Sequence, residues 1–370
     1  MASTAELPRA DSGRSGFLPD RIVHLHPTRL CNLACLHCYS TSAPRHRAAL
    51  EPGLVGEALA VLRAEGYVSV SLSGGEPLVY RPLSAVVERA RELGFRVTMV
   101  TNGLLATKRR EGLLSELDGI AISFDGLAGT HDAMRGQAGA FERASAALAR
   151  LAALGLPVGA AISLTREAIP ELPDLAVHLV GLGARSLQIR PVARAGRARS
   201  LAPGSFHGPA DLARLYLVVL ALRHELPAEV RVNCDLAPAR GLWEERDAYA
   251  GLLADCADLP REERPLAELV NPLVITDTGA LKPIAYDFHA RFDVGSLESL
   301  SGTSLRDYKR NGVAEFEALV GGALAGLRDR NDLVDWFDHC ARLSEAHADG
   351  DARAVAAWSG GGGIRTHGAR

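Results

Sequence analysis

The stretch Val23–Tyr39 reads VHLHPTRLCNLACLHCY and places three cysteines directly after a short strand-like run. Cys31, Cys35 and Cys38 follow a C-x3-C-x2-C spacing, which indicates one tight loop. Three thiolates arranged in this way can bind three irons of a [4Fe–4S] cluster and leave the fourth iron open to another ligand. Two other interpretations stay open at this point. One is a structural zinc site with His37 as a fourth ligand, and the other is buried thiols that bind no metal.

Strand-like and helix-like segments alternate outward from this loop over the first half of the chain. Strands are predicted at Val23–Pro27, Val68–Leu72, Arg96–Thr101, Gly119–Phe124, Val158–Leu164 and Ser186–Pro191, and helices at Gly56–Glu65, Leu83–Leu93, Leu113–Leu117, Phe141–Leu154 and Leu172–Leu182. This alternation favours right-handed βαβ units and a parallel sheet, either open or curved into a partial barrel. Ligands of such folds bind at the carboxyl ends of the strands, where the cysteine loop lies.

Composition excludes several classes of protein. The chain has 370 residues, with 41 Lys and Arg against 44 Asp and Glu. It therefore lacks the net positive charge by which a polybasic protein binds nucleic acid. Hydrophobic residues make up 47% and charged residues 23%, the balance of a folded protein. No apolar run is long enough to span a membrane, and Met1–Asp20 lacks the apolar core of a secretory signal. Six cysteines are too few for a disulfide scaffold, so we expect a cytoplasmic protein without nucleic-acid or membrane partners.

A glycine pair follows the second predicted strand in Leu72–Pro77, which reads LSGGEP. Gly74 and Gly75 let the backbone approach a ligand closely, and Glu76 offers a carboxylate to an ammonium group. A Gly-Gly pair alone is usually only a turn. Because it comes one βα unit after the three-cysteine loop, the combination resembles the signature of the radical S-adenosylmethionine (radical SAM) superfamily.

The resemblance implies an α/β fold, cofactors and a reaction. The fold would be a partial (β/α)6 TIM-like barrel with a small C-terminal α+β domain. Cys31, Cys35 and Cys38 would bind a [4Fe–4S] cluster, and S-adenosylmethionine would chelate the open iron. Gly74, Gly75 and Glu76 would hold its methionine amino group. Electron transfer to the sulfonium would produce a 5′-deoxyadenosyl radical, which abstracts hydrogen from a C–H bond.

Further segments at the strand ends carry the same resemblance. Asn102, in a Thr-Asn-Gly segment, would flank the cofactor, while Ser123 and Asp125 would contact its ribose. Ser163 and Arg190 would contact the cofactor from the fifth and sixth strands. Each has an alternative: a simple turn for Asn102, a helix cap or turn for Asp125, an ion pair or surface role for Arg190, and a structural role for Ser163.

The segment Thr130–Gly136, which reads THDAMRG, resembles the branch of the superfamily that contains the SPASM/twitch enzymes. Members of that branch modify peptides or synthesise cofactors. His131 and Arg135 have two interpretations: contact with substrate or cofactor, and bracing of a loop, which we favour. This branch also predicts a C-terminal hairpin, which Pro272–Ile284 matches.

The C-terminal third departs from the branch pattern. Ile284 stands where SPASM relatives have the first cysteine of an auxiliary cluster. Cys234, Cys256 and Cys340 are widely dispersed, as buried hydrophobic cysteines usually are. We therefore expect a degenerate SPASM/twitch-like domain without a second cluster, acting as a substrate-binding lid. The predicted divisions are an N-terminal arm (1–20), the barrel (21–205), a helical linker (206–265), this domain (266–345), and a helix end with a flexible tail (346–370).

The substrate class is less constrained than the reaction. The branch resemblance favours modification of a ribosomally synthesised peptide, for example by cross-linking or epimerisation. The alternatives are a small-molecule metabolite or cofactor precursor as substrate, and a non-catalytic iron–sulfur or zinc protein. Expected partners are an electron donor such as flavodoxin or ferredoxin and, because twenty N-terminal residues leave no room for a leader-binding domain, a separate leader-binding protein.

Overall fold

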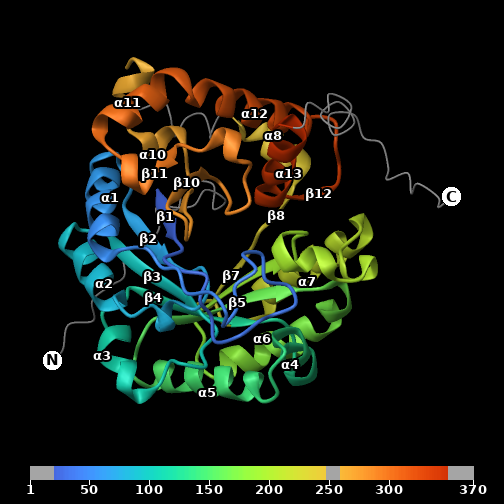
Figure 1. Cartoon of the computed structure of the whole chain (residues 1–370). Coiled ribbons are helices and arrows are strands. Elements are labelled where there is room, and N and C mark those ends of the chain that lie inside the picture. The colour runs from blue at the N-terminus through green and yellow to red at the C-terminus, as the bar shows by residue number, and fades with distance from the viewer. Residues whose placement is uncertain (1–20, 247–258, 349–370) are drawn as a thin grey trace.

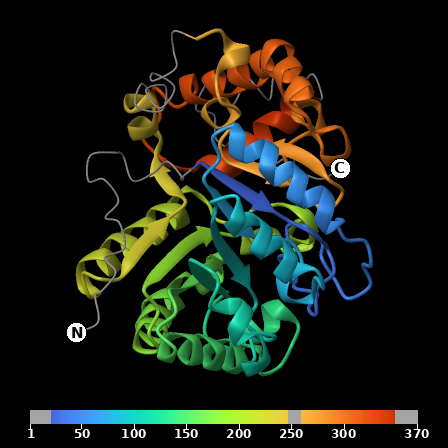
Figure 2. The ribbon, with the colours of Figure 1, turned by 90° about the vertical axis from the view of Figure 1, so that its left-hand side faces the viewer.

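The computed structural model describes residues 21–246 and 259–348. Its centre is a sheet in which β1 to β7 run parallel in sequence order, and the parallel arrangement of the first six strands is as predicted. These strands are β1 (Ile22–Leu25), β2 (Ser69–Leu72), β3 (Arg96–Thr101), β4 (Gly119–Phe124), β5 (Val158–Leu164), β6 (Ser186–Pro191) and β7 (Arg231–Cys234). The sheet curves, and Figures 1 and 2 show helices along its outer side.

Helices cover the sheet, and most of them bury one apolar face because their apolar residues recur at helical spacing. They are α1 (Pro52–Ala64), α2 (Leu83–Glu92), α3 (Glu111–Leu114), α4 (Ala128–Arg135), α5 (Ala140–Ala153), α6 (Leu172–Gly181) and α7 (Pro209–Glu225). In α5, Ala144, Leu148 and Leu151 enter the main core. Side chains along the strands alternate between this core and the inside of the barrel. In β4, Ile122 and Phe124 are fully buried in the core, while Ala121 and Ser123 face the inside of the barrel.

The segment 206–265, predicted as a helical linker, holds more than helix. Its strand β7 extends the barrel by pairing in parallel with β6. Sequence analysis did not identify this strand because RVNC is short and carries only two apolar residues. The segment also contains β8 (Leu236–Pro238) and α8 (Ala239–Glu244).

The C-terminal part is joined to the barrel through the sheet. The predicted hairpin forms as β9 (Leu273–Ile275) and β10 (Ala280–Pro283), and β9 pairs in parallel with β1. A further short strand, β11 (Gly295–Ser296), ends the ten-stranded sheet beyond β10. Ile284 follows β10 with φ of 62°, a left-handed conformation that is uncommon for a β-branched residue.

Helices of the C-terminal part lie over one end of the barrel in both ribbon views (Figures 1 and 2). They are α10 (Leu266–Leu269), α11 (Gly302–Asn311), α12 (Val313–Ala325) and α13 (Trp336–Ala348). Directly before α13 lies the strand β12 (Leu333–Asp335), which pairs with β8. The predicted arm at 1–20 and the tail beyond 348 lie outside the described residues.

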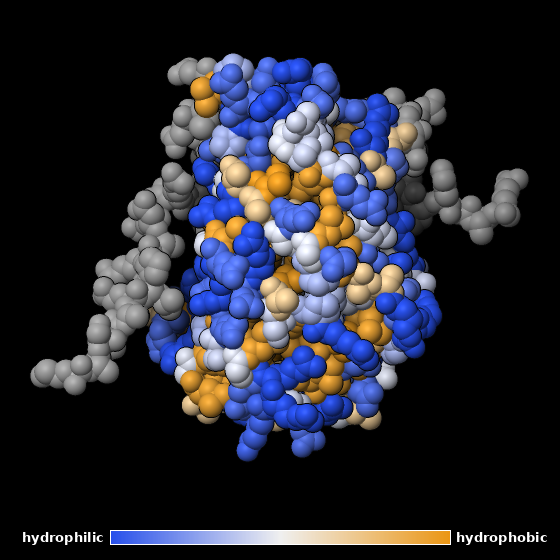
Figure 3. Space-filling view, turned by 60° about the vertical axis from the view of Figure 1, so that its left-hand side comes forward, coloured by the Kyte–Doolittle hydropathy of each residue, from blue (hydrophilic) through white to orange (hydrophobic). Residues whose placement is uncertain are grey.

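Figure 3 shows a face on which hydrophilic residues surround several separate hydrophobic patches. Within residues 21–246 and 259–348, no helix has the length and apolar character needed to cross a bilayer.

Candidate active site

The cysteine loop follows β1 and is held against α4. The backbone N–H of Leu36 donates to the carbonyl of Met134 at 2.9 Å. Cys31 and Cys35 are buried and Cys38 is half-buried, and all three are free thiols. Burial raises the pKa of the Cys31 thiol to about 12 and also raises that of Cys35, so the loop needs a positive partner to hold thiolates.

The donors around the three sulfur atoms fit an anionic cluster. The backbone N–H of Leu33 donates to Cys31 Sγ at 3.4 Å, and that of Ser42 donates to Cys38 Sγ at 3.3 Å. The guanidinium of Arg135 reaches Cys35 Sγ at 3.9 Å. Each sulfur therefore accepts an N–H from the protein, and such bonds tune iron–sulfur clusters.

The described residues do not form a site for a single metal ion. Across residues 21–246 and 259–348, no three His, Cys, Asp or Glu side chains are grouped to hold one ion. The cysteines of a [4Fe–4S] cluster each bind a separate iron, so they need not converge on one point. His37, the fourth ligand of the zinc interpretation, instead directs Nε2 at Asp125 Oδ1, 3.0 Å away.

The glycine pair after β2 packs against the backbone of the cysteine loop. Gly74 has φ of 103°, and a Cβ on Gly75 would lie 2.1 Å from the Leu30 carbonyl oxygen. The N–H groups of Gly75 and Glu76 donate to the carbonyls of Thr28 and Leu30 at 2.8 and 3.0 Å. These glycines were expected to let the backbone approach a ligand closely. In the described structure, the backbone that they approach is that of the cysteine loop.

Glu76 is buried behind this turn, with 1% of its surface exposed. One carboxylate oxygen accepts from the Thr101 hydroxyl at 2.7 Å and from the Leu78 N–H at 3.1 Å. The other accepts from the Asn102 N–H at 2.9 Å. Burial raises the pKa of Glu76, while these hydrogen bonds oppose that shift. Glu76 thus ties the end of β2 to the end of β3.

Asn102 carries this connection back to the cysteine loop. Its amide nitrogen donates to Asn32 Oδ1 at 2.9 Å and lies 4.0 Å from Cys31 Sγ. Its amide oxygen accepts from the Leu104 N–H at 3.0 Å. The structure therefore brings the second and third motifs against the cysteines.

Asp125 lies at the centre of a buried charge network. Arg135 donates to both of its oxygens, at 2.5 and 2.9 Å. His131 Nδ1 lies 3.6 Å from Asp125 Oδ2, whereas His37 contacts Oδ1 of the same carboxylate. Burial alone would raise the pKa of Asp125. Arg135 and His37 outweigh that effect and hold the pKa of Asp125 well below its ordinary value. Contact between Asp125 and the ribose stays a prediction, while Arg135 makes contacts of the bracing kind expected for it.

The other predicted contacts line the inward face of the next strands. Ser123 on β4 and Ser163 on β5 are half-buried, and Ser163 pairs with Arg190 in the β5–β6 register. The Arg190 side chain is 47% exposed and lies 3.3 Å from Asp235, an ion pair that raises the pKa of Arg190. Cofactor contact by these three residues stays a prediction.

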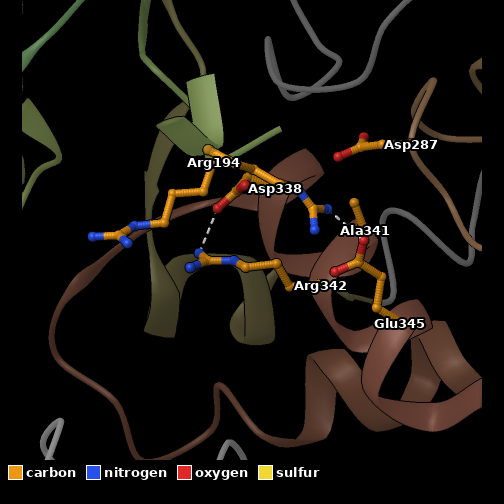
Figure 4. Close-up of a pocket in the computed structure, with 7 residues that line it drawn as sticks. Arg194, Asp287, Asp338, Ala341, Arg342 and Glu345 are labelled. Carbon is orange, nitrogen blue, oxygen red and sulfur yellow. Dashed lines mark hydrogen bonds and ion pairs between the residues drawn. The ribbon is translucent and has the colours of Figure 1, made fainter. Parts of the chain in front are cut away.

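A charged cavity of about 260 Å³ lies between the loop after β6 and helix α13. Arg194 and Arg199 line it from the loop, and Asp338 and Arg342 from the helix. In Figure 4, Asp338 and Arg342 point toward each other, and they form an ion pair. The cavity therefore presents both signs of charge.

Asp335, which caps α13, provides a pH-dependent test of this region. It accepts from the N–H groups of Phe337 and Asp338, both at 3.1 Å. Burial, with Asp235 and Asp338 nearby, raises the pKa of Asp335 to about 7. The folded protein thus binds a proton that the unfolded chain releases above about pH 4, so this group lowers stability as pH rises from about 4 to 7.

We expect Asp335→Asn to become more stable relative to the parent protein as pH rises through that window. An asparagine oxygen can still cap the helix but carries no charge. Urea unfolding of both proteins at pH 5 and pH 8 measures the effect. Asp332→Asn is the control: Arg330 lowers the pKa of Asp332, so this carboxylate is ionised in both the folded and the unfolded protein at pH 5 and pH 8, and the difference from the parent should be the same at both values. A difference between Asp335→Asn and the parent that is the same at both pH values contradicts the expectation.

Several residues hold the cysteine loop in a way that the sequence did not predict. Arg197, after β6, donates to the carbonyls of Cys35 and Ser42 at 2.7 and 2.8 Å. Asp277, in the turn of the C-terminal hairpin, accepts from Arg29 at the start of the loop, and Tyr286, shortly after the hairpin, donates to Asp277. Position alone offered a signal for Arg197, since it follows a barrel strand. Nothing in the sequence pattern pointed to the hairpin residues.

Comparison with known proteins assigns the domain. Residues 25–176 match the family model described as the Radical SAM superfamily. A S-adenosylmethionine-dependent nucleotide dehydratase from Selenomonas ruminantium is 34% identical over 84 residues, 22% of this chain and 30% of that protein. A pre-heme d1 synthase from Dinoroseobacter shibae is 32% identical over 160 residues, 42% of this chain and 40% of that protein. The chain thus spans less than half the length of these curated relatives.

Solved structures share the fold at low sequence identity. The structure of Streptococcus suis SuiB bound to S-adenosylmethionine aligns with a TM-score of 0.60 at 17% identity, covering 81% of this chain and 68% of SuiB. Native anSMEcpe with bound AdoMet aligns with the same TM-score at 14% identity, covering 90% of this chain and 99% of that chain. At these identities the likeness concerns the fold.

Residues 25–176 are therefore a radical SAM domain, which confirms the resemblance and the predicted barrel. Members of the family that residues 25–176 match use a [4Fe–4S] cluster and S-adenosylmethionine. The described cysteines, with a donor on each sulfur, fit that cofactor pair.

Proposed function

We propose that this chain cleaves S-adenosylmethionine reductively and abstracts hydrogen from a C–H bond of its substrate. The observation that carries the proposal is the packing of the Gly74–Glu76 turn and Asn102 against the three-cysteine loop at the carboxyl edge of the barrel. The chemistry supplied by cluster and cofactor together is one-electron cleavage of the sulfonium, which gives the 5′-deoxyadenosyl radical. Cys31, Cys35 and Cys38 would hold the cluster.

The remaining residues position and enclose that chemistry. Arg135 and the N–H donors stabilise negative charge on the sulfur atoms, and Glu76 fixes the turn that would meet the methionine amino group. The inward positions of β4 and β5 carry small residues, among them Ser123 and Ser163, which leave space inside the barrel. A dry and rigid site suits a reactive radical, because it fixes the target hydrogen and excludes side reactions.

Glu76 provides a test of cofactor binding. Glu76→Gln places an amide N–H against the N–H of Asn102 or of Leu78, so we expect unfolding free energy to fall by about 1–3 kcal/mol. It also removes the charge offered to the methionine ammonium, and we expect affinity for S-adenosylmethionine to fall about tenfold or more while iron is retained. Calorimetry on reconstituted protein measures that affinity. Glu51→Gln, which alters an exposed helix cap, is the matched control. Equal affinity in Glu76→Gln and the parent protein contradicts the assignment.

A ribosomally synthesised peptide is the substrate class that we propose. Support comes from the shared fold with SuiB, one structure of which holds the precursor peptide SuiA. A small-molecule substrate is the second candidate, supported by the names of the curated relatives. For peptide modification we also propose a separate leader-binding protein, and for either reaction an electron donor such as flavodoxin or ferredoxin.

The deciding experiment begins with anaerobic reconstitution and reduction by dithionite. Formation of 5′-deoxyadenosine establishes the radical SAM reaction, and its absence from protein with a full cluster overturns the proposal. Short peptides encoded beside the gene are then added. A mass change in the peptide together with increased 5′-deoxyadenosine supports the peptide class. Stimulation only by nucleotide or other small-molecule fractions favours the second candidate.

A further inference from the structure

The C-terminal hairpin contacts the cysteine loop through one buried carboxylate. Asp277 follows β9, and its side chain is 4% exposed. Its Oδ2 accepts from Arg29 Nε at 2.8 Å, and its Oδ1 accepts from the Tyr286 hydroxyl at 2.5 Å. Both oxygens therefore have a donor, one from the start of the cysteine loop and one from the hairpin.

Arg29 stands where this contact can act on the loop. It lies two residues before Cys31, and its own carbonyl accepts from the Ala43 N–H at 3.2 Å, where the loop returns. Arg29 thus connects the two ends of the segment that carries all three cysteines. Fixing its side chain restrains the base of that segment.

Tyr286 extends the contact to the glycine turn. Its ring stacks on His26 with centroids 5.1 Å apart, and His26 Cβ lies against Gly74. Tyr39, directly after Cys38, meets the same ring edge-on with centroids 5.6 Å apart. One side chain of the hairpin therefore touches residues on both sides of the cysteine loop and beside the glycine turn.

A second ion pair in the hairpin has a different location. Lys282 donates to Asp293 Oδ1 at 2.9 Å and to the Phe288 carbonyl at 2.8 Å. These contacts stay within the C-terminal part. Asp293 is a partly buried carboxylate that has a charged partner, as Asp277 has, but it does not contact the cysteine loop. A variant of Asp293 therefore distinguishes an effect on the stability of the hairpin from an effect on the cysteine loop.

We propose that Asp277 and Tyr286 are positioning residues for the cluster-binding loop, and that the C-terminal hairpin acts on the radical site through them. This inference rests on the proposed function, since it assigns the loop a cluster. The role differs from that of a lid, because the hairpin would act on cluster retention even without substrate.

The first measurement uses the apoprotein, so that it does not depend on the cluster. Hydrogen–deuterium exchange over residues 30–42 is compared for the parent protein, Asp277→Asn, Tyr286→Phe and Asp293→Asn. We expect faster exchange in that loop for the first two variants and unchanged exchange for Asp293→Asn. Unchanged loop exchange in Asp277→Asn overturns the inference, whatever the enzyme's activity.

The second measurement uses the reconstituted protein. Loss of a residue that orients a metal ligand commonly weakens retention by 10–100-fold, so we expect iron release to a chelator about tenfold faster in Asp277→Asn. Removing that negative charge should also raise the midpoint potential of the cluster. Equal release rates for Asp277→Asn and Asp293→Asn overturn the positioning role.

A double variant separates charge from position. Arg29→Gln with Asp277→Asn restores the local net charge but not the contact. We expect the midpoint potential to return toward the parent value while iron release stays fast. If the double variant restores slow release as well, the contact acts through charge alone and the positioning role is wrong. Failure of the proposed function is recognised separately, by a parent protein that holds no cluster or forms no 5′-deoxyadenosine.

Discussion

Replacing Cys35 with alanine is expected to abolish 5′-deoxyadenosine formation. Cys35 is buried on the loop, and its sulfur faces the guanidinium of Arg135. A cluster held by three thiolates loses one iron ligand in Cys35→Ala, and no neutral neighbour can replace a thiolate. We expect iron per chain to fall from about four to well below that value.

Cys340→Ala is the matched control for this experiment. Cys340 is also a fully buried free cysteine, but it belongs to the hydrophobic core around α13. Its loss should cost stability without changing iron content, and the same holds for Cys234. Iron counted by a colorimetric assay and 5′-deoxyadenosine counted by chromatography measure the two effects. Normal turnover in Cys35→Ala contradicts the assignment of the cluster ligands. A parent protein that holds about eight irons per chain and loses about half of them in Cys340→Ala has a second cluster.

Local periodicity explains which parts of the fold the sequence predicts. The bounds of β3, β4, β5 and β6 are as predicted, because each strand has apolar residues at alternate positions or throughout. Pairing between β9 and β1 was not predicted, because their residues are about 250 positions apart and register is a long-range property. For the same reason the predicted C-terminal domain was not recognised as an extension of the barrel sheet.

The candidate site likewise contains residues that the sequence predicts and contacts that it does not predict. Spacing along the chain identifies the cysteines and Glu76, because those residues act in short motifs. It cannot identify the partner of a charged group, since Arg29 and Asp277 are 248 positions apart. Asp125 is an intermediate case: both it and Arg135 were selected, yet only the structure shows that they bind each other.

That buried pair provides the second large effect. Arg135→Met is expected to destabilise the protein by about 3–5 kcal/mol, because it leaves the Asp125 carboxylate buried without its main partner. Asp125 is 1% exposed, so water cannot replace the guanidinium. Arg89→Met is the control: the Arg89–Glu92 pair is exposed, and its loss should cost less than about 1 kcal/mol. Guanidinium unfolding of the apoproteins at pH 7 measures both values.

The pH dependence of the same variant follows from Asp125. In the parent protein its pKa is depressed, so the stability it contributes is present above the unfolded pKa of about 3.9 and is lost as pH falls through the folded value. Without Arg135, burial should raise the pKa of Asp125, and the carboxyl then becomes neutral on mild acidification. The deficit of Arg135→Met should therefore be largest at pH 7 and smaller at pH 5. An equal deficit at both values contradicts this account.

A double variant distinguishes the stability of the fold from the support of the cluster. Arg135→Met with Asp125→Asn removes both charges, and we expect it to recover much of the lost stability because no unpaired carboxylate remains buried. It cannot restore the donor to Cys35 Sγ, so iron release should stay about tenfold faster than in the parent protein. Recovery of stability together with slow release would show that Arg135 only neutralises Asp125. Fast release in a stable double variant places the guanidinium itself in the support of the cluster.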